Sequence, residues 1–120
     1  MNSDNNPEHS EEKYSNTEIK KRELEGIVTT LNKNYLSFQQ KYKVKEICII
    51  GSYARGEQTK ESDIDIMVNF KEPIGWEVVD LRDDLEKLLG IKVDLILKAG
   101  IMQRKRLYSE ILKDAVHVKA

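Results

Sequence analysis

The chain has 120 residues, the usual length of one domain, which leaves room for only a modest core. Its 20 basic and 21 acidic residues give a net charge of -1, so no overall positive field favours nucleic acid, and we expect no direct nucleic-acid binding. No stretch approaches the roughly 20 apolar residues that span a bilayer, and the N-terminus lacks the apolar core of a signal peptide. A cytoplasmic protein without membrane contact is therefore expected.

The N-terminal segment differs in composition from the rest of the chain. Residues 1–14 are polar, and we expect a disordered tail there, followed by a single domain over residues 15–120. From about Asn16 the pattern becomes helical, because apolar side chains recur at steps of three and four residues and form one stripe. The stripe consists of Leu24, Ile27, Val28, Leu31, Tyr35, Phe38 and Tyr42.

Two strands are expected in the middle of the chain. Residues 46–50 are apolar, β-branched and too few for a helix, which indicates a buried central strand that ends at Gly51. Cys48, the one cysteine, is expected to be a small buried side chain in it. One or two helical turns and a polar loop follow. Residues 63–70 then alternate, with Ile64, Ile66, Val68 and Phe70 on one face and Asp63, Asp65, Met67 and Asn69 on the other.

The second half of the chain predicts further elements of the same kinds. A helix is expected from Trp76 to Leu89, ended by Gly90, and an alternating strand over residues 91–98. A last helix over residues 101–114 and a short edge strand over 116–119 complete the order. This order predicts an α/β (α+β) fold in which a small sheet is backed by helices on one face.

Asp63 and Asp65 are the first candidates for a chemical role. Side chains two apart on a strand share a face, about 7 Å apart by the strand rise. If the strand 91–98 is the neighbour, Asp94 joins them from the same polar face. Clustered carboxylates raise one another's pKa unless a cation neutralises them, and hard Mg²⁺ prefers carboxylate oxygens completed by substrate phosphates. The pattern predicts a Mg²⁺ site, with these three aspartates as ligands, that a nucleotide completes.

The turn at Gly51 and Ser52 supplies the phosphate side of this argument. Gly51 permits a tight turn, Ser52 adds a hydroxyl, and backbone N–H groups at the start of the next helix attract anions. In-line displacement at the α-phosphorus would follow, clamped by metal ions, with Asp94 accepting the proton of the attacking hydroxyl. Each piece alone also has a structural reading: a common glycine turn, a capping Ser62 with solvated aspartates, and an aspartate on a surface strand.

These residues resemble the signature of the minimal nucleotidyltransferases in the DNA polymerase β-like superfamily. The pattern GSxARGxxxxxSDxDxxV matches from Gly51 to Val68 without a gap, and a later aspartate follows. The resemblance covers about residues 17–115 and implies a mixed sheet backed by helices. It implies that Asp63 and Asp65 bind both of two Mg²⁺ ions and that Asp94 binds one and acts as base. Gly51 and Ser52 would hold the triphosphate of ATP.

Within this superfamily, short stand-alone members resemble the antitoxin halves of two-gene toxin–antitoxin systems. The resemblance implies transfer of AMP from ATP to a tyrosine of a cognate HEPN ribonuclease toxin, with which the chain would form a hetero-oligomer. Polymerases and antibiotic adenylyltransferases carry further domains, for which this chain has no room. Two alternatives stay open: a non-catalytic antitoxin that acts by binding alone, and nucleotidyl transfer to a small molecule such as an antibiotic.

Some signals support more than one reading. Arg55 matches the arginine of the family signature and would either contact phosphate or brace its loop by pairing with Glu57 or Glu61. The basic run Arg104, Lys105 and Arg106 is either a solvated helix face or a docking point for an acidic partner. Trp76 is expected in the core or as a lid over the site, and His117 is expected to be structural.

Overall fold

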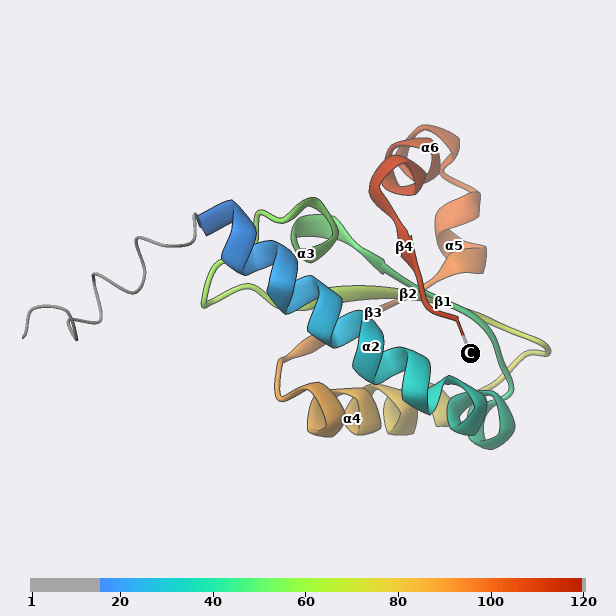
Figure 1. The fold of residues 1–120 in the computed structure, drawn as a ribbon. Coiled ribbons are helices and arrows are strands. Elements are labelled where there is room, and N and C mark those ends of the chain that lie inside the picture. Colours follow the sequence, from blue (N-terminus) through green and yellow to red (C-terminus); the bar gives the residue numbers. More distant parts are fainter. Residues whose placement is uncertain (1–15, 120) are drawn as a thin grey trace, which may run out of the picture.

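The computed structural model describes residues 16–119, which form a four-stranded mixed sheet surrounded by helices (Figure 1). The predicted small sheet backed by helices is confirmed, and the tail predicted for residues 1–14 lies outside the described residues. The elements are α2 (Asn16–Tyr42), β1 (Val44–Ile50), α3 (Gly51–Arg55), β2 (Ile64–Phe70), α4 (Glu77–Leu89), β3 (Val93–Leu97), α5 (Lys98–Met102), α6 (Lys105–Asp114) and β4 (Val116–His117).

The strand order is β3-β2-β1-β4. β1 runs antiparallel to both β2 and β4, whereas β2 and β3 run parallel and are joined through α4. β1 and β2 therefore form the centre of the sheet, as their apolar sequences predict. Because β1 ends where β2 begins, the turn after β1 and the first residues of β2 meet at one end of the sheet.

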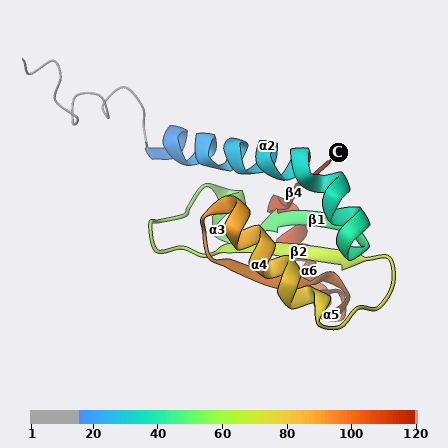
Figure 2. The ribbon, with the colours of Figure 1, turned by 90° about the horizontal axis from the view of Figure 1, so that it is seen from below.

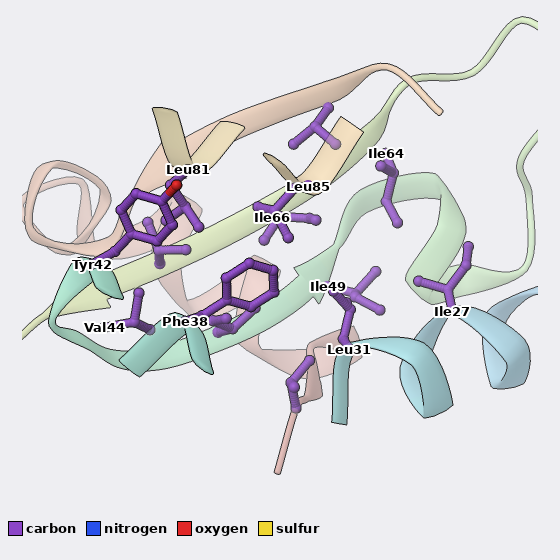
Figure 3. Packing of buried hydrophobic residues seen from close by; sticks show 14 of the residues in the cluster. Ile27, Leu31, Phe38, Tyr42, Val44, Ile49, Ile64, Ile66, Leu81 and Leu85 are labelled. Carbon is purple, nitrogen blue, oxygen red and sulfur yellow. The ribbon is translucent and has the colours of Figure 1, made fainter. Parts of the chain in front are cut away.

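The main core lies on the face of the sheet that α2 and α4 cover (Figure 3). α2 contributes the predicted stripe, of which Leu31 is fully buried, and α4 contributes Leu81 and Leu85. These side chains pack on Ile64 and Ile66, which the alternation of β2 assigns to this face. α4 ends at Gly90, whose φ of 68° is the left-handed conformation that suits glycine past a helix end.

The opposite face of the sheet is also partly covered, so the expectation that all helices pack on one face was wrong. Cys48, Ile50 and Met67 are buried there, and α6 packs on them through Tyr108 and Ile111. Figures 1 and 2 show α2 and α4 on one side of the sheet and α5 and α6 on the other. Met67 belongs to the face of β2 that was predicted to be polar. On that face Asp65 and Asn69 are polar, whereas Met67 between them is buried under α6.

Smaller differences concern the ends of elements and one aromatic residue. β1 begins two residues earlier than predicted, and β3 spans residues 93–97 rather than 91–98. The helix predicted over 101–114 is two helices, α5 and α6, which are separated at Gln103 and Arg104. Trp76 is 85% exposed and lies beyond the far end of β2, so it is neither a core residue nor a lid. No helix within residues 16–119 has the length and apolar character needed to cross a bilayer.

Candidate active site

The parallel pairing of β2 and β3 brings two of the predicted site residues together. Asp65 and Asp94 are direct partners in the register of the two strands, so the predicted neighbour relation is confirmed. Asp63 immediately precedes β2, and its charge acts on Asp65 and on the hydroxyl of Tyr53. The three aspartates therefore gather at the end of the sheet where β2 and β3 begin and β1 ends.

Asp65 is the least accessible of the three carboxylates, while Asp63 and Asp94 are exposed. Burial raises the pKa of the Asp65 carboxyl, and the charges of Asp94 and then Asp63 raise it further. The positive charge of Arg55 acts in the opposite direction but is weaker than either. A half-buried carboxylate between two others, at the end of a strand, is a site that gains from a bound cation.

Gly51 allows the backbone to pass directly beside this carboxylate. Its φ of 75° is left-handed, and a Cβ placed on it would overlap Oδ2 of Asp65 and lie 3.2 Å from Cγ. Ile50, the residue before it, is the register partner of Asp65. Position 51 thus requires glycine twice, for its backbone conformation and for the space that Asp65 occupies.

Ser52 follows at the start of the short helix α3, within the same turn. The backbone carbonyl of Ser52 accepts a hydrogen bond from the N–H of Glu57 at 2.8 Å, which closes α3. Tyr53 anchors α3 in the main core. The loop after α3 is tied to α2 by buried Gln58, whose Nε2 donates to the carbonyl of Lys20 at 3.1 Å. These contacts fix the glycine-serine turn against the aspartates.

Arg55 pairs with Glu57, its Nε donating to Oε1 at 3.0 Å. This ion pair is the bracing contact that one of the two sequence readings predicts, and it raises the pKa of the guanidinium. The side chain is nevertheless partly exposed, and its charge reaches Asp65. The pairing therefore leaves a phosphate contact open as a second role.

Sequence reasoning missed a second cluster of metal-ligating side chains. Among residues 16–119, the group of three whose ligand atoms all lie within 4.8 Å of one another is Glu46, Cys48 and His117, and not the three aspartates. Glu46 and Cys48 are two apart on β1, which was a visible signal, but only the pairing of β4 with β1 brings His117 to them.

Comparison with known proteins identifies the family of the chain. A model of the nucleotidyltransferase domain family matches residues 31–118, and the chain belongs to that family. Protein adenylyltransferase MntA of Thermococcus cleftensis is 36% identical over 97 residues, which cover 80% of this chain and 93% of that protein. A Methanocaldococcus jannaschii protein, named provisionally as a protein adenylyltransferase, is 54% identical over 81 residues, or 65% of this chain and 81% of that one.

Solved structures show the same fold. One, described provisionally as a minimal nucleotidyltransferase, has a TM-score of 0.64 and 31% identity, and the match covers 78% of this chain and 93% of that chain. A mutant form of the toxin–antitoxin MntA–HpeT has a TM-score of 0.53 and 25% identity, over 72% of this chain and 68% of that chain. The predicted enzyme class, a nucleotidyltransferase, and the predicted fold of the minimal nucleotidyltransferases are therefore confirmed.

Proposed function

We propose that this enzyme transfers AMP from ATP to a tyrosine hydroxyl of a cognate HEPN-type toxin and thereby neutralises the toxin. The observation that carries this proposal is the pairing of Asp65 with Asp94 beside the close approach of Gly51. The similarity to a protein adenylyltransferase and to a toxin–antitoxin complex supports a protein as the acceptor.

The donor set at this end of the sheet fits magnesium. Asp63, Asp65 and Asp94 offer carboxylate oxygens alone, which are the ligands that Mg²⁺ prefers, and we propose that they hold two ions. Bound Mg²⁺ would neutralise the phosphates of ATP and the charge that develops at the reacting phosphorus. Burial, and after it the charges of Asp94 and Asp63, raises the pKa of the Asp65 carboxyl, and a bound cation would offset this cost of ionising it.

The residues of the chain would bind the substrate and move one proton. The backbone of Gly51, with the backbone and hydroxyl of Ser52, would receive the β- and γ-phosphates, and Arg55 would add a positive charge. Asp94, which is exposed, would accept the proton of the attacking tyrosine hydroxyl. The tyrosine oxygen then bonds to the α-phosphorus, the bond from that phosphorus to the β-phosphate oxygen breaks, and pyrophosphate leaves.

Mass spectrometry of the acceptor tests this proposal. The enzyme is incubated with ATP, Mg²⁺ and the protein encoded by the neighbouring gene, and we expect that protein to gain the mass of one or more AMP groups. Asp63→Asn, Asp65→Asn and Asp94→Asn should each lower the rate at least about a hundredfold. Asp83→Asn is the matched control, because Asp83 is exposed on α4 and pairs with its neighbour Arg82 at 3.7 Å, away from the three aspartates.

Two outcomes would contradict the proposal. If the neighbouring protein gains no mass but is still neutralised by the aspartate variants, the chain acts by binding alone. If labelled AMP appears instead on a hydroxylated antibiotic, the acceptor is a small molecule. Each outcome leaves the membership of the nucleotidyltransferase domain family untouched, since that rests on the match over residues 31–118.

A further inference from the structure

The cluster of Glu46, Cys48 and His117 lies on the sheet face that also carries the aspartates. β4 pairs antiparallel with β1, so that His117 is the direct register partner of Cys48. The Sγ atom of Cys48 and Nδ1 of His117 are 3.1 Å apart. Glu46, two residues before Cys48, shares its face, and its Oε2 lies 3.9 Å from the same Nδ1. One sulfur, one nitrogen and one oxygen atom therefore converge from two strands.

Lys98 fixes the orientation of the glutamate. Its Nζ donates to Oε1 of Glu46 at 2.6 Å, in a pair that is mostly shielded from solvent. This hydrogen bond holds the pKa of the Glu46 carboxyl below its usual value. Because Lys98 engages Oε1, the other oxygen, Oε2, faces His117. This is the role that an outer hydrogen-bond partner has at a metal site.

The burial of the three side chains differs in a way that suits a bound ion. Cys48 is only 1% exposed, whereas the His117 side chain is half exposed and Glu46 is partly exposed. An ion can thus enter from the side of His117, and water can take a fourth position. Burial, and after it the charge of Glu46, raises the pKa of the Cys48 thiol to about 11.

We propose that Glu46, Cys48 and His117 form a second metal site that binds one Zn²⁺ ion. Thiolate sulfur and imidazole nitrogen are ligands that zinc accepts in tetrahedral sites and magnesium does not, so the site is chemically distinct from the aspartates. Binding releases the thiol proton of Cys48 to water and forms the bond from sulfur to zinc. The ion would tie the short strand β4 to β1 and so secure the chain that follows α6.

Cobalt is the spectroscopic probe for this site, because Co²⁺ occupies zinc sites and its absorption reports the ligands. The full chain is titrated with Co²⁺ in the absence of ATP. We expect a sulfur-to-cobalt charge-transfer band in the near ultraviolet and the intense visible bands of a tetrahedral site, saturating at one ion per chain and bleached by Zn²⁺. In Asp65→Asn the bands should persist, since that variant alters only the carboxylate site.

Variants of the ligands complete the test. Cys48→Ala should abolish the charge-transfer band, and His117→Gln, at a half-exposed position, should weaken Zn²⁺ binding by about a hundredfold or more. His9→Gln, which changes the other histidine, is the matched control and should bind as the wild type does. A wild-type spectrum with only weak six-coordinate bands, or unchanged Zn²⁺ affinity in His117→Gln, would overturn the proposal. Neither readout requires the proposed AMP transfer.

Discussion

Gly51 and Asp65 determine one another's positions at the candidate active site. The backbone of Gly51 passes so close to the Asp65 carboxylate that any side chain at position 51 would overlap it. This backbone therefore limits the movement of the carboxylate on one side. Asp94 provides the other neighbour, across the parallel pairing of β2 and β3. A reacting group that is held on both sides by backbone-defined positions loses little freedom when the substrate binds.

Replacement of Gly51 by alanine should therefore affect activity more than stability. The left-handed φ of 75° costs alanine about 1–2 kcal/mol, and the added Cβ also displaces Asp65. We expect AMP transfer to fall about a hundredfold, as for a catalytic group misplaced by about 1 Å. Gly56→Ala is the matched control, because its φ of 71° carries the same strain while a Cβ there meets nothing within 4 Å. Equal activity in the two variants, measured beside their thermal unfolding, would show that the contact with Asp65 is unimportant.

The charge of Asp65 predicts a conflict between stability and function. Since its pKa is raised in the fold, the ionised carboxylate destabilises the metal-free protein at any pH above that pKa. Asp65→Asn should raise the Tm in chelator at pH 7 to 8 by roughly 2–5 °C, or ~0.5–1 kcal/mol, while it abolishes transfer. The gain should shrink as the pH falls through the raised pKa of Asp65, and it should vanish only below the ordinary value of 3.8, where the wild-type carboxyl is neutral in both the folded and the unfolded states.

Calorimetry with and without Mg²⁺ checks this account. Mg²⁺ should raise the Tm of the wild-type protein and have a much smaller effect on Asp65→Asn. Asp83→Asn, at an exposed position on α4, should respond to Mg²⁺ as the wild type does. A lower Tm for Asp65→Asn in chelator would mean that the carboxylate stabilises the fold through its contacts rather than straining it.

Helices and strands could be predicted from the sequence where the spacing of apolar residues alone determines which side chains are buried. The alternation of β2 assigns Ile64 and Ile66 to the core and Asp65 to the other face, and the helical period of α2 predicts its buried stripe. The spacing of Gly51, Asp63 and Asp65 is local and therefore also readable. Asp94 lies beside Asp65 only because β3 pairs with β2, and the order of strands in a sheet cannot be predicted from a local sequence pattern.

The second face of the sheet could not be predicted for the same reason. Cys48, Ile50 and Met67 occupy only the middle of that face, too few positions to indicate a covering helix, and the apolar side of α6 fits either face. Both α5 and α6, which are separated at Gln103 and Arg104, lie on this second face. His117 looked isolated because its partners lie about seventy residues away in the chain, a separation that pattern reasoning does not bridge.

At the scale of the whole molecule, the face of the sheet that α6 covers has polar residues at both ends and apolar residues in the middle. The aspartates occupy one end, the cluster of Cys48, Ile50 and Met67 lies under α6, and Glu46 with His117 occupies the other end. Successive residues on one strand face are about 7 Å apart, so on β1 Cys48 lies one such interval and Glu46 two, roughly 13 Å, from the row of Asp65. The two proposed sites share a sheet but no ligand.

Mg²⁺ with a non-hydrolysable ATP analogue and Zn²⁺ should consequently stabilise the protein independently. At a hundredfold excess over its dissociation constant, each ligand should add about 2.7 kcal/mol to the free energy of unfolding, and the two gains should sum within about 0.5 kcal/mol. Asp65→Asn should lose only the nucleotide-dependent part and His117→Gln only the zinc-dependent part, as denaturant titrations would measure. A combined gain well below the sum would mean that the ions compete for one site or that α6 must move for one of them to bind. If His117→Gln instead lost both the nucleotide-dependent and the zinc-dependent stabilisation, the zinc site would be coupled to the nucleotide site. β1, which pairs with both β4 and β2, would then carry that coupling.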